Sequence, residues 1–166
     1  MGGTGASSRP ARICSTVISR MRNILAAVDF SPISDLVIAR ASELAQAFGS
    51  ALWLVHVAAP DPDFVGYESG PQSVRETVAA ELRDAHRHLQ EQSAALRERG
   101  IDCTALLVQG STTETLVREA ERLNADLIVL GSHGHGAIRR ALLGSVSEHV
   151  LHHARRPLLI LPAPAA

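Results

Sequence analysis

The chain has 166 residues, of which 46% are hydrophobic, 20% charged and only 3% aromatic, a composition typical of one soluble globular domain. The formal net charge is −1 and all 16 basic residues are arginine, so Schiff-base chemistry and a Walker A phosphate loop, which need lysine, are excluded. No run approaches the about 18 apolar residues of a membrane span, and no basic, aromatic-rich stretch indicates a nucleic-acid groove. We therefore expect neither a membrane nor a nucleic acid as a partner.

The N-terminal segment, residues 1–21, is rich in Gly, Ser and Arg and contains no acidic residue. We interpret it as a flexible extension, while a transit peptide and a translation start at Met21 remain alternatives. Cys14 and Cys103 form neither a CxxC pair nor a disulfide framework, which favours a reducing compartment. The expected location is therefore the cytoplasm.

Between residues 22 and 162 short apolar runs alternate with helical periods, and this stretch is predicted to be one domain, followed by a tail at 163–166. Strands are expected at residues 23–28, 52–57, 101–108, 126–130 and 157–161. Helices are expected to begin at the N-cap candidates Ser31, Ser73 and Ser111, and a further helix is expected to begin at Gly144 or Ser145. Strands that alternate with helices predict parallel βαβ units, in which ligands bind beyond the carboxyl ends of the strands.

A glycine-rich segment follows the fourth predicted strand. Gly131, Gly134 and Gly144, with Ser145 next in the chain, have the spacing G-x2-G-x9-G-Ser. Glycines let main-chain N–H groups crowd an anion, and a helix starting at Ser145 adds free N–H groups and a positive dipole end. The segment predicts a phosphate site; the alternative is that the glycines only form turns and Ser145 with Glu148 only a capping box.

Three stretches resemble the universal stress protein family: NILAAVDFS, LVHV, and ADLIVLGSHGHG with the following LLGSVSEHVLHHARRPLLIL. The glycine spacing resembles that of the ATP-binding members. The resemblance implies a single-domain α/β fold with an open sheet of five parallel strands in the order 3-2-1-4-5 and helices on both faces. It also implies ATP as the ligand, with or without Mg²⁺, and a homodimer joined through the edge strand Pro157–Leu161.

The resemblance further assigns a nucleotide site by matching position. Asp29 would face the adenosine, the main chain at Val57 would read the adenine edge, and Gly131 would approach the ribose. The residues alone also allow Asp29 to act as a negative charge at a helix N-terminus before Ser31. The candidate nucleotide-binding residues are Ala27, Val28, Asp29, Val57, Gly131, Ser132, His133, Gly134, Gly144, Ser145, Val146 and Ser147. Arg139 and Arg140 are candidates for further phosphate contacts, with solvated side chains as the alternative.

The expected function is regulation of a stress response through nucleotide binding and an unidentified protein partner. No catalytic residue is expected. No metal site is expected either, since His149, His152 and His153 have helical spacing but no further residue to complete a metal site. An enzyme is one alternative, either one that hydrolyses ATP slowly or one that resembles the related adenine-nucleotide α/β enzymes, which cleave between the α- and β-phosphates. Against the second stands Asp29-Phe-Ser-Pro, at the place after the first strand where such enzymes usually carry a glycine-rich Ser-Gly-Gly loop. A dimeric interaction module without nucleotide is the other.

Overall fold

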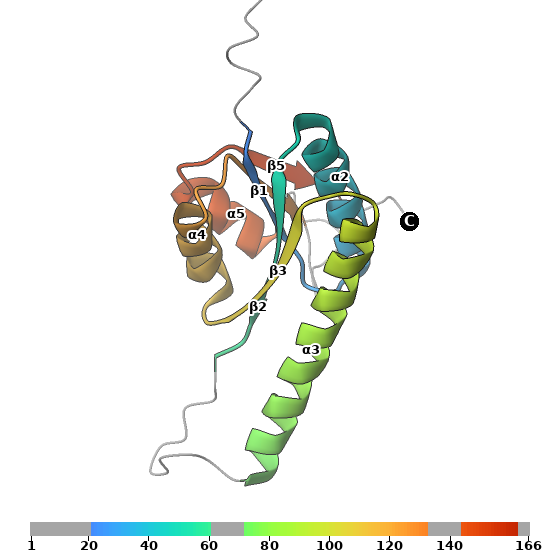
Figure 1. The fold of residues 1–166 in the computed structure, drawn as a ribbon. Coiled ribbons are helices and arrows are strands. Elements are labelled where there is room, and N and C mark those ends of the chain that lie inside the picture. The colour runs from blue at the N-terminus through green and yellow to red at the C-terminus, as the bar shows by residue number, and fades with distance from the viewer. Residues whose placement is uncertain (1–20, 61–71, 133–143, 163–166) are drawn as a thin grey trace, which may run out of the picture.

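The computed structural model describes residues 21–60, 72–132 and 144–162, and its centre is an open sheet of five parallel strands in the order β3-β2-β1-β4-β5 (Figure 1). The strands are β1 (Asn23–Ala27), β2 (Ala51–Ala58), β3 (Cys103–Gln109), β4 (Leu127–Gly131) and β5 (Leu158–Leu161). The helices of the described ranges are α2 (Pro32–Phe48), α3 (Gln72–Glu98), α4 (Thr112–Arg122) and α5 (Ser145–His153). The predicted α/β fold and strand order are confirmed.

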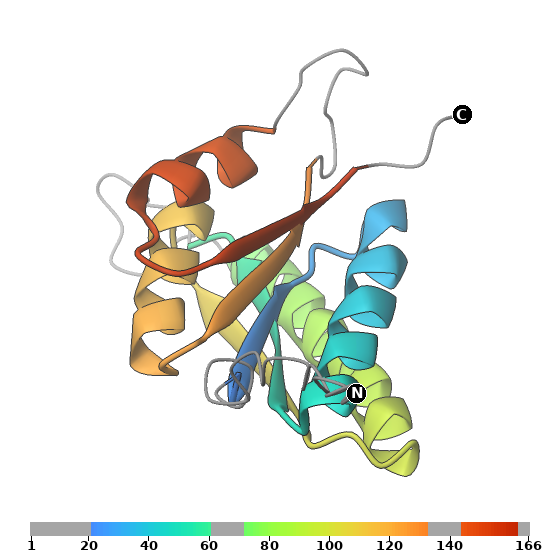
Figure 2. The same ribbon diagram turned by 90° about the horizontal axis from the view of Figure 1, so that it is seen from above.

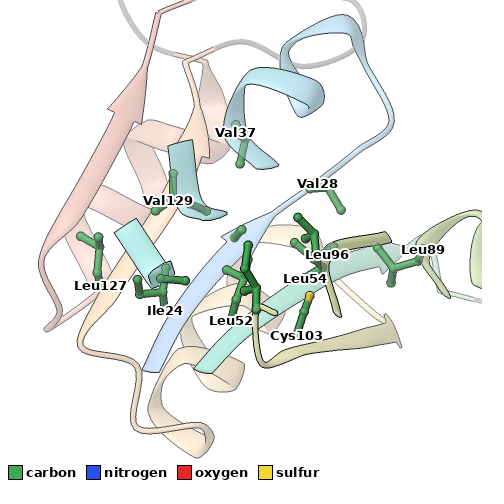
Figure 3. Close-up of a cluster of buried hydrophobic side chains, with 14 of the residues drawn as sticks. Ile24, Val28, Val37, Leu52, Leu54, Leu89, Leu96, Cys103, Leu127 and Val129 are labelled. Carbon is green, nitrogen blue, oxygen red and sulfur yellow. The ribbon is translucent and has the colours of Figure 1, made fainter. Parts of the chain in front are cut away.

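The helices form one layer on each face of the sheet. Figure 2 shows α2 and α3 on one side and α4 and α5 on the other. Each face has its own apolar cluster: Ile24, Leu52 and Leu54 lie under α2 and α3 (Figure 3), whereas Leu25 and Ile128 lie on the opposite face. Burying one such side chain contributes about 1.5–3 kcal/mol, which explains why the strands are continuous apolar runs.

The helix ends agree only in part with the predicted caps. Ser31 precedes α2, Pro32 is its first residue, and Gly49 ends it in a left-handed conformation with φ 65°, as the sequence predicts. The assignment of Ser73 as an N-cap is wrong, because α3 begins at Gln72. The predicted start of the last helix is confirmed, since α5 begins at Ser145 with Gly144 as its N-cap. Ser31 and Ser111 precede α2 and α4 as predicted, but neither side chain makes a capping hydrogen bond to its own helix.

The longest helix, α3, has 27 residues and one buried face. Leu89, Ser93 and Leu96 are buried against the sheet, and the Ser93 hydroxyl donates to the carbonyl oxygen of Cys103 at 3.1 Å. Burial raises the pKa of the Cys103 thiol, so this cysteine is an inert core residue. In none of the described segments is there a helix long and apolar enough to cross a membrane.

Candidate functional site

The candidate site lies where the strand order reverses, at the carboxyl ends of β1 and β4, which is the switch point at which open α/β sheets bind ligands. Val28 and Asp29 follow β1, Ser132 follows β4, and Val57 lies near the end of β2. The other candidates that the structure describes are Ala27 at the end of β1, Gly131 at the end of β4, and Gly144, Ser145, Val146 and Ser147 at the start of α5. The candidates His133, Gly134, Arg139 and Arg140 lie outside the described residues.

The carboxylate of Asp29 is held by the start of α2. Its Oδ1 accepts hydrogen bonds from the N–H of Ser31 at 3.0 Å and from the hydroxyls of Ser31 and Ser34 at 2.5 and 2.9 Å. The Ser31 hydroxyl is thus oriented toward Asp29, and its oxygen accepts no capping bond from the helix. A negative charge at a helix N-terminus is also favourable, so the helix-terminal role considered for Asp29 is part of its function in the fold.

The residue after Asp29 was not predicted to belong to the site. Phe30 has a left-handed backbone with φ 60°, which is uncommon for a bulky residue and often marks a functional turn. Its ring centroid lies 4.4 Å from that of His56 on β2 and 4.8 Å from that of His88 on α3. Three segments distant in sequence therefore meet beside Asp29. No local pattern in the sequence indicated this cluster of rings.

His56 bonds to the main chain at the end of β1. The imidazole Nδ1 lies 2.8 Å from the carbonyl oxygen of Val28. Because a carbonyl oxygen only accepts hydrogen bonds, Nδ1 carries the proton and donates. The sequence indicated His56 only as part of the LVHV strand, which predicts its position but not this bond.

The segments that leave β4 and enter α5 are joined to each other. The N–H of Gly144 donates to the carbonyl oxygen of Ser132 at 2.6 Å, and the hydroxyl of Ser147 donates to that of Gly131 at 2.7 Å. The Ser132 N–H in turn donates to the carbonyl oxygen of Leu161 on β5 at 2.8 Å. Ser147 is buried and directs its hydrogen toward the sheet, so its hydroxyl holds α5 against β4 in this conformation.

The start of α5 still offers main-chain donors. A helix leaves its first N–H groups without a partner inside the helix. Among the residues that the structure places, the amides of Ser145 and Val146 have no hydrogen-bond acceptor, and the Ser145 side chain is exposed. These amides and the positive end of the helix dipole suit an anion.

Gly131 has a packing role that the spacing of the glycines did not reveal. A Cβ atom built on Gly131 would lie 2.7 Å from Cγ2 and 3.1 Å from Cδ1 of Ile33, which is buried on α2. The first glycine of the motif is therefore required by the contact between α2 and β4. This requirement is independent of any ligand.

The described ranges contain no group of three or more His, Cys, Asp or Glu side chains arranged to hold a metal ion. On α5, the rings of His149 and His153 stack with centroids 4.0 Å apart, and Nδ1 of His153 donates to the carbonyl oxygen of His149 at 2.8 Å.

The model of the universal stress protein family matches residues 21–162. The chain belongs to this family. It is 38% identical over 134 residues to "Universal stress protein A homolog 1" of Coxiella burnetii, covering 79% of this chain and 89% of that protein.

Solved structures of the universal stress protein family have the same fold. The universal stress protein UspA of Lactobacillus plantarum matches with a TM-score of 0.75 and 22% identity, over 86% of this chain and 98% of that one. A universal stress protein solved in complex with cAMP matches with a TM-score of 0.58 and 24% identity, over 84% of this chain and 95% of that one. At these identities the likeness establishes the fold of the chain.

Proposed function

We propose that this universal stress protein binds an adenine nucleotide, with ATP as the favoured ligand, and acts as a nucleotide-dependent regulator. One observation carries the proposal. The carboxylate of Asp29, the main chain of Val57 and the N-terminal amides of α5 lie at the carboxyl edge of one sheet, on both sides of its switch point. Their chemistry matches the parts of a nucleotide: a hydroxyl-binding acceptor, a base-reading main chain and an anion-binding helix end.

The nucleoside would be held by β1 and β2. The N–H and C=O of Val57 form a donor and an acceptor on the side of β2 that faces β1, complementary to the N1 acceptor and the N6 amino group of adenine. The Asp29 carboxylate can accept a hydrogen bond from a ribose hydroxyl, as acidic residues do in dinucleotide-binding folds. Ala27, the last residue of β1, and Val28, which follows it, support this end through their main chain. Gly131 at the end of β4 and Ser132 after it lie next to this end.

The phosphates would be held at the start of α5. Ser145 contributes its amide and hydroxyl, and Val146 contributes its amide. Gly144 and Ser147 have a positioning role here, since the Gly144 amide and the Ser147 hydroxyl both bond to the end of β4. His133, Gly134, Arg139 and Arg140 remain proposed phosphate contacts, and a Mg²⁺ ion on the phosphates remains part of the proposal.

In the regulatory role, bound nucleotide would change the surface that an unidentified protein partner recognises, in the cytoplasm and in a homodimer joined through Pro157–Leu161. Slow hydrolysis and a nucleotide-free interaction module are the competing functions. Mass spectrometry of nucleotide released from the purified protein, followed by titration with ATP, AMP and cAMP with and without Mg²⁺, separates the nucleotide-binding functions from the nucleotide-free module. Protein that carries no nucleotide and binds none of the three at millimolar concentration would support the interaction module.

Replacing Asp29 by alanine should weaken adenosine and ATP by the same factor, because the proposed contact is to the nucleoside. The lost hydrogen bond corresponds to about 0.5–3 kcal/mol of binding free energy. Asp29→Asn keeps an acceptor for Ser31 and Ser34 and separates the effect on the helix start from the effect of charge. Calorimetry measures both affinities, with Asp35→Ala, an acidic residue in the first turn of the same helix, as the control. Unchanged affinity in folded Asp29→Ala protein would remove Asp29 from the site.

Replacing Ser145 by alanine should weaken ATP and leave adenosine unaffected, because Ser145 lies at the phosphate end. The expected loss is about 0.5–3 kcal/mol, depending on the charge of the phosphate oxygen it contacts. Ser111→Ala is the matched control. Like Ser145, Ser111 is an exposed serine at the start of a helix, and it makes no side-chain capping bond. Equal weakening of adenosine and ATP in Ser145→Ala would contradict the assignment of the phosphate end to α5.

A further inference from the structure

The hydrogen-bond ladder between β1 and β2 ends in an unusual way. The two strands pair in parallel from Asn23↔Ala51 to Ala27↔Val55, and the N–H of Val28 still donates to the carbonyl oxygen of Val55 at 2.9 Å. In a parallel ladder the next bond would run from the N–H of Val57 to the carbonyl oxygen of Val28. That oxygen instead accepts from the imidazole Nδ1–H of His56 at 2.8 Å.

The side chain of His56 thus takes the place that the amide of Val57 would have in a continued ladder. Main-chain groups of successive strand residues point to opposite sides, and the carbonyl oxygen of Ala58 accepts from Gly110 on the β3 side. The N–H and C=O of Val57 therefore point toward β1, beyond the point where the pairing stops. In the part of the chain that the structure describes, they have no hydrogen-bond partner there.

A half-buried main-chain donor and acceptor without partners are costly, and proteins usually satisfy them. Here β1 passes into the turn at Asp29 and Phe30, and the left-handed Phe30 places its ring against that of His56. His88 contacts the same Phe30 ring from α3. The imidazole is therefore held in place by one hydrogen bond and by ring packing.

We propose that His56 is a positioning residue of the nucleotide site: by occupying the Val28 carbonyl it keeps the Val57 main chain available to the edge of an adenine base. This inference rests on the proposed function for the identity of the ligand. The release of the Val57 amide from the ladder does not depend on the ligand. The two claims are therefore separately testable.

The test compares two substitutions of His56. Asparagine places its side-chain N–H where the imidazole has Nδ1–H and can still donate to Val28, whereas leucine fills a similar volume with no donor. In His56→Leu the amide of Val57 is free to bond to Val28 and extend the ladder. His88→Leu is the control, because it alters a ring contact with Phe30 without touching the Val28 oxygen.

We expect His56→Leu to weaken adenosine and ATP about tenfold and by the same factor, and His56→Asn to stay within about threefold of the wild type. Hydrogen exchange of the Val57 amide, followed by NMR without nucleotide, should be fast in the wild type and in His88→Leu but protected in His56→Leu. A merely structural His56 would leave that protection unchanged.

Two results would overturn the inference. One is a Val57 amide already protected in the nucleotide-free wild type, which needs no variant to observe. The other is folded His56→Leu protein that binds adenosine as tightly as the wild type. If the wild type binds no adenine nucleotide, the proposed function fails, while the exchange measurement still decides whether His56 displaces the Val57 amide. Should His56→Leu not fold, the inference would still be contradicted by a protected Val57 amide in the wild type or by a tenfold loss of affinity in His56→Asn.

Discussion

Replacing Ile160 by proline should convert the proposed homodimer into a monomer. On β5, the carbonyl oxygens of Pro157 and Leu161 accept hydrogen bonds from Ile128 and Ser132, so the odd-numbered residues face β4. The main-chain groups of Leu158 and Ile160 therefore face the open edge of the sheet. The strand sequence, Leu158 to Leu161, carries no charge, and an uncharged open edge is usually covered by pairing. An antiparallel pair of β5 strands around a two-fold axis would satisfy these groups.

Proline at position 160 removes one outward N–H and leaves the ladder to β4 intact, because Ile160 does not donate to β4. Ile160→Val is the matched control, since it keeps the N–H and a side chain of similar size, and it should remain dimeric. Light scattering at micromolar concentration gives the mass directly, against 17.7 kDa for one chain. A wild-type monomer, or a dimer that persists in Ile160→Pro, would contradict pairing through β5.

Replacing Gly131 by alanine should lower the free energy of unfolding by about 1–3 kcal/mol, the usual cost of forcing a methyl group into a packed interior. The new Cβ would lie 2.7 Å from Cγ2 of Ile33, a branch close to the main chain that cannot move away by rotating a distant bond. Denaturant titration of the nucleotide-free protein measures the loss.

The double variant with Ile33→Ala identifies the cause. Ile33→Ala alone should cost about 2–5 kcal/mol through the cavity it leaves, and in the double variant the alanine methyl of position 131 enters that cavity. The two losses should therefore sum to more than the loss of the double variant, by about 1 kcal/mol or more. Strictly additive losses would mean that Ile33 does not set the requirement for glycine.

The fold could be predicted from local patterns of apolar residues. Such a pattern requires only that one face of a strand or helix is buried in the core, and does not depend on which residues it contacts there. Apolar runs predict buried strands, and periodic apolar positions such as Leu89 and Leu96 predict the covered face of α3, which the structure confirms. Helix caps were less predictable, because the orientation of the Ser31 hydroxyl depends on the Asp29 carboxylate beside it, and in that orientation its oxygen accepts no bond from the helix.

The place of the candidate site could be predicted from the glycine spacing and from residues at strand ends, both of which are local properties of the chain, whereas the nucleotide roles of its residues came from the family resemblance and stay predictions. The contacts that shape this site are not local. His56 bonds to Val28 and His88 packs on Phe30 only after the strands have paired in the order β3-β2-β1-β4-β5. Likewise, Gly131 excludes a side chain because α2 brings Ile33 against it. A hydrogen bond or a steric contact between distant segments depends on register and helix position, which the whole core sets together, and no short stretch of the chain encodes it.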